Sequence, residues 1–166
     1  MATVTFLNNP VHTAGELPQK GTTAPKFELV KGDLSTLTDE ELRGKRILLN
    51  IFPSLDTSVC ATSVRKFNQK AAQMKNTLVL AVSKDLPFAQ SRFCATEGID
   101  NVVAVSAFRS TKFGKEYGVE LIDGPLAGLL CRAVIIIDES GKILYEQLVP
   151  EITHEPDYEA AIEALK

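Results

Sequence analysis

Ile47-Leu48-Leu49-Asn50-Ile51-Phe52 runs directly into Pro53-Ser54-Leu55-Asp56-Thr57-Ser58-Val59-Cys60. The apolar run predicts a buried strand, and the residues after Cys60, Ala61–Met74, are compatible with a helix. A thiol where a strand passes into a helix lies near unpaired helix N–H groups and the positive end of the helix dipole. Both favour the thiolate, which is the reactive form, so Cys60 is predicted to be a nucleophile. The alternative is a structural thiol, because free cysteine is among the most buried residue types.

The chain around this stretch alternates between strand-like and helix-like segments. The predicted elements are strands at Arg46–Phe52, Thr77–Ser83 and Val102–Val105, and helices at Ser63–Lys75, Pro87–Glu97 and Thr111–Tyr117. Arg132–Asp138 and Lys142–Leu148 form two more strands, which are antiparallel because their connection is so short. A last helix follows Glu155-Pro156-Asp157. This order predicts an α/β fold with a mixed central sheet and flanking helices, as in thioredoxin-like domains.

The first third of the chain is predicted to be an N-terminal extension of that domain. Alternation in Thr3–Leu7 indicates a strand, paired in a hairpin with Val11–Thr13. Thr38–Leu42 is predicted to be a short helix, with Thr38 as N-cap and Glu41 completing a capping box. A length of 166 residues predicts one domain, 1–166, that needs no disulfide or metal to fold.

Composition gives no reason to expect a nucleic-acid or membrane partner. The net charge is −3, and the local basic residues Arg65, Lys66, Lys70 and Lys75 are typical of a solvated helix face. No apolar run approaches the length of a membrane span, and the N-terminus lacks the basic and apolar regions of a signal peptide. We therefore expect a cytoplasmic protein.

The three cysteines do not predict a disulfide framework or a metal site. Their number is odd and none are close in sequence, which argues against a secreted disulfide-bonded domain. The chain has no CxxC motif, and its two histidines, His12 and His154, lie far from each cysteine in sequence. No metal or other cofactor is expected.

Three segments together resemble one family. Pro53, Thr57 and Cys60 match the PxxxTxxC motif of peroxiredoxins. With Asp85-Leu86-Pro87-Phe88-Ala89-Gln90-Ser91-Arg92-Phe93-Cys94, and with Gly124-Pro125-Leu126-Ala127-Gly128 followed by Arg132-Ala133-Val134, they closely resemble the bacterial thiol peroxidase subfamily. The similarity covers essentially the whole chain.

The resemblance implies a role for five residues. Cys60 would be the peroxidatic cysteine, oxidised by hydrogen peroxide or an organic hydroperoxide to sulfenic acid. Cys94 would be the resolving cysteine and form an intramolecular disulfide with it. Thr57 and Arg132 would position the peroxide, and Pro53 would shield the thiolate from water. The resemblance also implies a homodimer and a reductant of the thioredoxin type.

The residues alone leave other interpretations open. Arg132 begins a predicted buried strand, where its partner is either a thiolate or a carboxylate in an ordinary surface ion pair. Without the resemblance, Cys94 would be interpreted as a core thiol. Cys131 matches no functional position and is predicted to be a small core or surface thiol. If Cys60 and Cys94 do form a disulfide, their separate helices predict that one must unwind locally, because bridged Cβ atoms lie within about 4.5 Å.

Three other functions compete with that of a peroxidase. A thioredoxin-like disulfide carrier would need a second thiol three residues beyond Cys60, and that position is Ser63. A glutathione peroxidase would pair its thiol or selenol with tryptophan and glutamine, and the chain has no tryptophan. A redox sensor or binding module could use the same Cys60 chemistry and stays open as a second role.

Overall fold

The structure is a computed structural model that describes residues 1–166. Its strands are β1 (Thr3–Phe6), β2 (Asn9–His12), β3 (Glu28–Lys31), β4 (Thr36–Thr38), β5 (Arg46–Ile51), β6 (Thr77–Ser83), β7 (Val102–Ser106), β8 (Ala133–Ile137) and β9 (Ile143–Leu148). Its helices are α1 (Ser58–Ala71), α2 (Pro87–Glu97), α3 (Phe113–Glu116) and α4 (Tyr158–Ala164), with a 3-10 turn at Glu40–Leu42.

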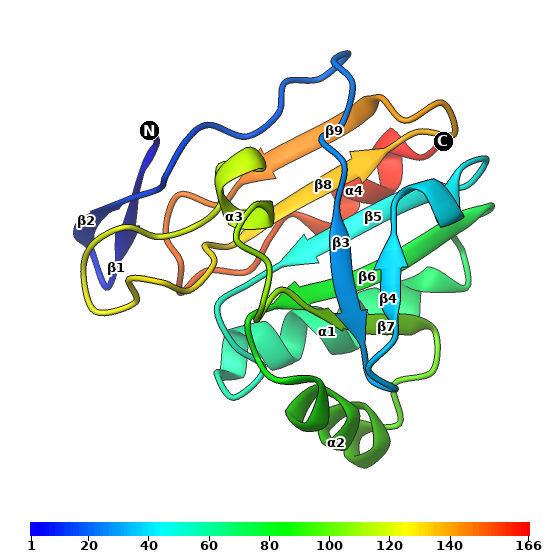
Figure 1. Cartoon of the computed structure of the whole chain (residues 1–166), viewed down its shortest axis with the longest axis horizontal. Coiled ribbons are helices and arrows are strands. Elements are labelled where there is room, and N and C mark those ends of the chain that lie inside the picture. The colour runs from blue at the N-terminus through cyan, green and yellow to red at the C-terminus, as the bar shows by residue number, and fades with distance from the viewer.

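Seven strands form one mixed sheet in the order β4-β3-β7-β6-β5-β8-β9 (Figure 1). Strands β5, β6 and β7 are parallel, β8 runs antiparallel to β5, and β9 runs antiparallel to β8. β6 occupies the central parallel position that its continuous apolar sequence predicts. The predicted α/β fold with a mixed sheet and a terminal hairpin is confirmed.

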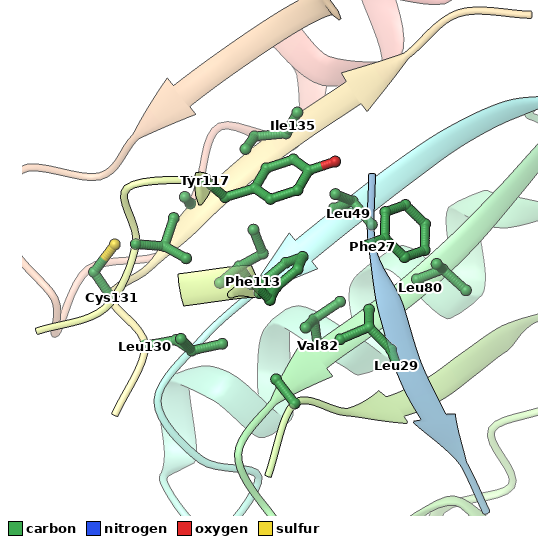
Figure 2. Packing of buried hydrophobic residues seen from close by; sticks show 14 of the residues in the cluster. Phe27, Leu29, Leu49, Leu80, Val82, Phe113, Tyr117, Leu130, Cys131 and Ile135 are labelled. Carbon is green, nitrogen blue, oxygen red and sulfur yellow. The ribbon is translucent and has the colours of Figure 1, made fainter. Parts of the chain in front are cut away.

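The central strands are buried on both faces because helices cover both sides of the sheet (Figure 1). Along β5, Leu49 and Ile51 belong to the core on the α3 side, and Leu48 belongs to the core under α1 and α4. Figure 2 shows the α3 side, where Phe113 and Tyr117 lie over the sheet. Their rings stack at 4.7 Å between centroids. This two-sided packing holds the ends of β5 and β8 in fixed positions.

Several predicted helix limits are corrected by the structure. α1 begins at Ser58 and not at the predicted Ser63, because Thr57 is the extended residue that precedes the helix. The first turn lies before Val64, where the apolar spacing used to predict the helix begins. α3 is confined to Phe113–Glu116. The predicted helix at Thr38–Leu42 is a 3-10 turn with Asp39 at its N-cap. Only half of the capping box forms, with the Thr38 N–H 3.3 Å from a Glu41 carboxylate oxygen.

Strands β3 and β4 were not predicted from the sequence. They have four and three residues; β4 is an edge strand, and β3 lies between β4 and β7. β3 pairs with β7 through Val30 and Lys31. Such short segments carry too few alternating positions to show a period of two, so their pairing depends on the partner strand.

The predicted N-terminal hairpin is confirmed and lies at the side of the sheet (Figure 1). Its turn residues Leu7 and Asn8 have positive φ angles of 52° and 69°, as tight hairpin turns require. The hairpin joins the segment after β9 through Thr5, which donates its N–H to Pro150 and accepts from the Ile152 N–H, both at 2.8 Å.

Candidate active site

Cys60 lies in the first turn of α1, at the carboxyl end of β5. The loop from Pro53 to Thr57 connects the two elements, and Pro53 is buried. The Cys60 side chain is fully buried, at 0% exposure. As the third residue of α1 it has no intrahelical acceptor for its N–H, so the positive end of the helix points toward it. The predicted strand–helix junction is therefore present, with Cys60 inside the helix instead of before it.

Arg132 contacts the sulfur of Cys60 directly. It lies just before β8, is 2% exposed, and donates from Nη2 to Cys60 Sγ at 3.1 Å. Its Nε donates to the Ile152 carbonyl at 2.8 Å, and its Nη1 has no hydrogen-bond partner. The partner of the buried arginine is thus the thiol and not a carboxylate in a surface ion pair. The guanidinium therefore places a positive charge directly beside the sulfur.

Thr57 is exposed and forms the N-cap position of α1. Its hydroxyl donates to the Ser54 carbonyl at 2.9 Å, and no hydrogen bond links it to Cys60. The Thr57 hydroxyl therefore does not reach the sulfur itself. Because its hydrogen is committed to Ser54, its oxygen can only accept from a further group, which makes it an acceptor at the mouth of the site.

A buried polar bridge ties the first turn of α1 to the sheet. Ser63 donates its hydroxyl to the Cys60 carbonyl at 2.8 Å, and Asn50 in β5 donates from Nδ2 to Ser63 Oγ at 3.2 Å. Asn50 is 1% exposed. Ser63, which argues against a CxxC redox pair in the sequence, therefore holds the backbone of Cys60.

Asp85 fixes the loop that carries Thr57, a role that sequence reasoning missed. Its carboxylate accepts from the Ser54 hydroxyl and the Leu55 N–H, both at 2.8 Å, and from the Ser83 hydroxyl at 2.7 Å. The available signal was its position after β6, because residues that follow neighbouring parallel strands meet at one edge of the sheet.

Cys94 is half-buried in α2, and burial raises the pKa of its thiol. It lies one helical turn from Glu97, which forms a bidentate ion pair with Arg65 of α1 at 2.9 and 3.1 Å. Residues three apart share a helix face, so the Cys94 face of α2 is turned toward α1. All three cysteines are free thiols, and the structure does not join Cys60 to Cys94.

Cys131 packs on the opposite side of the sheet from Cys60. It belongs to the α3-side core, beside Leu130 in Figure 2, whereas Cys60 belongs to the α1-side core. Burial raises the pKa of the Cys131 thiol to about 12. Cys131 is thus a core thiol and not a surface thiol, the two settings predicted for it. It is held in the protonated form, which is unreactive.

The larger surface features lie away from Cys60. A hollow of about 840 Å³ lies between β3, β4 and the α3 region, and none of the five predicted site residues lines it. No group of three or more potential metal ligands is present. His154 is exposed, as its polar surroundings predict. None of the helices is both long and apolar enough to cross a membrane.

The fold and the site together define a thioredoxin-like protein with a buried cysteine that accepts a hydrogen bond from a buried arginine. Residues 19–162 match the Redoxin family. The chain is 56% identical to the thiol peroxidases of Mycobacterium bovis and Mycobacterium tuberculosis, over 99% of each sequence. It is also similar to the crystal structure of a peroxiredoxin-like protein from Aquifex aeolicus, at 42% identity and a TM-score of 0.94, covering 99% of this chain and 96% of that one.

A thiol peroxidase from Chromobacterium violaceum shares the fold at a TM-score of 0.90 and 22% identity, covering 98% of this chain and 94% of that one. The chain belongs to the Redoxin family and, within it, to the thiol peroxidases. It is therefore a thiol-dependent peroxidase, as the sequence resemblance implied.

Proposed function

We propose that Cys60 is the peroxidatic cysteine of this peroxidase. The observation that carries the proposal is the 3.1 Å contact from Arg132 Nη2 to Cys60 Sγ. The thiolate attacks the terminal oxygen of a hydroperoxide, an S–O bond forms and the O–O bond breaks. Sulfur becomes sulfenic acid, and the departing oxygen leaves as an alkoxide or hydroxide that takes up a proton to give alcohol or water.

The neighbours of Cys60 suit this displacement. The free Nη1 of Arg132 is a donor for the oxygen on which negative charge develops. The Thr57 oxygen, already donating to Ser54, is an acceptor for the peroxide O–H. Pro53 is buried and would exclude water from the thiolate, which keeps these electrostatic contacts strong.

Cys94 is proposed to resolve the sulfenic acid. Its thiol would displace the hydroxyl from the Cys60 sulfur, forming an intramolecular disulfide and releasing water. The α2 face that carries Cys94 is oriented toward α1, which supports this assignment. The burial of Cys131 on the other side of the sheet supports it as well. A dithiol reductant of the thioredoxin type would then reopen the bridge by thiol–disulfide exchange.

We also propose a homodimer that works in the cytoplasm. Leu86 and Phe88 at the start of α2, and Phe108 after β7, are apolar and exposed, and such side chains favour a protein contact surface. A cytoplasmic setting supplies the reduced thiol pool on which the cycle depends.

Stopped-flow oxidation with hydrogen peroxide and an alkyl hydroperoxide, followed by intact-mass analysis, tests the proposal. Cys60→Ser should abolish turnover, because a hydroxyl is scarcely ionised at neutral pH. Cys94→Ser should consume one peroxide per chain and stall as sulfenic acid or a further-oxidised form. Cys131→Ser is the matched control and should cycle normally. A Cys60–Cys131 bridge in the oxidised wild type, found by peptide mapping, would overturn the assignment of Cys94.

A further inference from the structure

Glu151 is a buried carboxylate near the site that has no cationic partner. It is 7% exposed and accepts four hydrogen bonds. Its Oε1 accepts from the Thr5 hydroxyl at 2.9 Å and the Asn8 N–H at 2.7 Å. Its Oε2 accepts from the Thr153 N–H at 2.8 Å and the Thr153 hydroxyl at 2.7 Å. One side chain therefore joins the N-terminal hairpin to the segment that follows β9.

These bonds keep Glu151 charged. Burial by itself raises the pKa of Glu151, but the bonds from Thr153, Asn8 and Thr5 outweigh burial and lower the pKa to about 2. A carboxylate that is removed from water and has no ion-pair partner is costly, so the negative charge must be stabilised by what it binds.

The bond from Thr153 connects this charge to Arg132. The N–H of Thr153 and the C=O of Ile152 belong to one planar peptide unit. Glu151 accepts from the N–H of that unit, and Arg132 Nε donates to its C=O at 2.8 Å. Hydrogen bonds in such a chain polarise one another, so the carboxylate makes the carbonyl a stronger acceptor for the guanidinium.

We propose that Glu151 is a positioning residue for the peroxidase reaction, acting on Arg132 through the Ile152–Thr153 peptide. The two bonds fix the plane of this peptide and thereby the direction of the Arg132 Nε–H bond. A guanidinium is planar and rigid, so holding Nε also sets where Nη2 meets Cys60 and where Nη1 points. The inference rests on the proposed function of Arg132 as the group that stabilises the departing oxygen.

The hairpin gains a role in catalysis from this connection. The Thr5 backbone holds both sides of residue 151, through Pro150 and Ile152, and its hydroxyl holds the carboxylate. The segment that presents the Ile152 carbonyl is therefore bound by the hairpin on one side and by Arg132 on the other.

Glu151→Gln tests the proposal, because it keeps the size of the side chain and removes its charge. Asp138→Asn is the matched control. Asp138 also accepts from the N–H and the hydroxyl of Ser140 and from the N–H of Lys142. It lies at the far end of β8 from Arg132. Two rate constants are measured for each variant, oxidation by hydrogen peroxide and alkylation by iodoacetamide. Alkylation needs the thiolate but not an oriented donor for the departing oxygen.

We expect Glu151→Gln to slow oxidation about tenfold, since small misplacements of a catalytic group carry losses of this order, and to slow alkylation less than threefold. Asp138→Asn should change neither. An oxidation rate constant in Glu151→Gln equal to that of the wild type would overturn the proposal. So would equal losses of the oxidation and alkylation rate constants in both variants. If Glu151→Gln does not fold, Thr153→Val and Thr5→Val each remove one bond to the carboxylate, and unchanged oxidation in both would count against it.

Arg132→Lys separates this inference from the function on which it rests. Slower oxidation in Arg132→Lys with wild-type oxidation in Glu151→Gln rejects only the positioning role. Unchanged oxidation in Arg132→Lys rejects the proposed role of the arginine, whatever Glu151→Gln does. The Nε–H resonance of Arg132, followed by NMR, should also move in Glu151→Gln and stay in place in Asp138→Asn.

Discussion

At the scale of single residues, the three nitrogens of Arg132 are used in three different ways. Nε is held by the Ile152 carbonyl, Nη2 lies on the Cys60 sulfur, and Nη1 is left without a partner. An unsatisfied buried donor costs about 1–3 kcal/mol. An acceptor at Nη1 would offset that cost, so under the proposed function the site is better matched to a bound peroxide oxygen than to its empty state.

Arg132→Lys should slow the oxidation of Cys60 by about ten- to a hundredfold, equivalent to ~1.4–2.7 kcal/mol of transition-state stabilisation. An ammonium is a point charge and cannot bind a backbone carbonyl, the sulfur and the peroxide in the fixed fork that Arg132 provides. Stopped-flow fluorescence or competition kinetics with hydrogen peroxide measures the rate constant. Equal rate constants in the two proteins would show that the arginine is only structural.

At the scale of the elements, the two halves of α2 are held very differently. Gln90 is 1% exposed and donates from Nε2 to Ser83 Oγ and the Val105 carbonyl, at 3.2 and 2.9 Å. The half that carries Cys94 is mostly exposed, and its polar contact with α1 is the Arg65–Glu97 pair. The first turn of α1 is fastened by Ser63 and Asn50. Local opening therefore favours the second half of α2.

Glu97→Gln should accelerate disulfide formation by about two- to fivefold, because an exposed ion pair contributes roughly 0.2–1 kcal/mol. Oxidation of Cys60 to sulfenic acid should not change, since the pair touches no site residue. Glu159→Gln is the matched control, because it removes the pair between Lys70 of α1 and Glu159 of α4, at 3.0 Å. Rapid-quench mass analysis measures the two steps. A slower or unchanged disulfide step, or an equal gain in Glu159→Gln, would contradict the prediction.

Hydrogen exchange should locate the unwinding directly. Amides of residues 92–98 should exchange faster in the oxidised protein than in the reduced one, because the proposed Cys60–Cys94 bridge needs Cβ atoms about 3.5–4.5 Å apart and the two cysteines lie in separate helices. Amides of residues 87–90 should keep their protection, since Gln90 holds that half to β6 and β7. Equal exchange of residues 92–98 in both redox states, measured by mass spectrometry, would be incompatible with this view.

At the scale of the whole molecule, acidic side chains join segments that are far apart in the chain. Glu151 connects the hairpin to the segment after β9, and Asp123 accepts from the backbone and the ring of His12 at 2.8 and 2.6 Å. Hydrogen bonds lower the pKa of both carboxyls. A carboxyl whose pKa is lower in the folded state stabilises the fold above its unfolded pKa and loses that contribution as pH falls through the folded value.

The free energy of unfolding should therefore fall as pH decreases from about 5, near the unfolded glutamate pKa, toward 2. Urea titrations of wild type and Glu151→Gln at several pH values measure the effect. The variant should be less stable than wild type near neutral pH, and the difference should shrink as the solution is acidified. Stability curves that run parallel across this range would refute the assignment of a pKa of about 2 to Glu151.

Much of this protein could be predicted from short-range patterns. The apolar run before Pro53, the intervals between Pro53, Thr57 and Cys60, and the limits of β6 and α2 are all visible in consecutive residues. They predicted the sheet type, the strand–helix junction that holds Cys60 and, by resemblance, the peroxidase family. These features are local because periodicity and turn chemistry act over a few residues.

The remaining features depend on contacts between residues far apart in the chain. Arg132 meets Cys60 at a sequence separation of 72 positions, and Glu151 meets Asn8 at a separation of 143. Asp85 reaches Leu55 only because β5 and β6 lie side by side. No short window contains both partners of such a bond, and their side-chain directions are set by packing on both faces of the sheet. Folding therefore buries the cysteine that local patterns single out and places the Arg132 guanidinium on its sulfur.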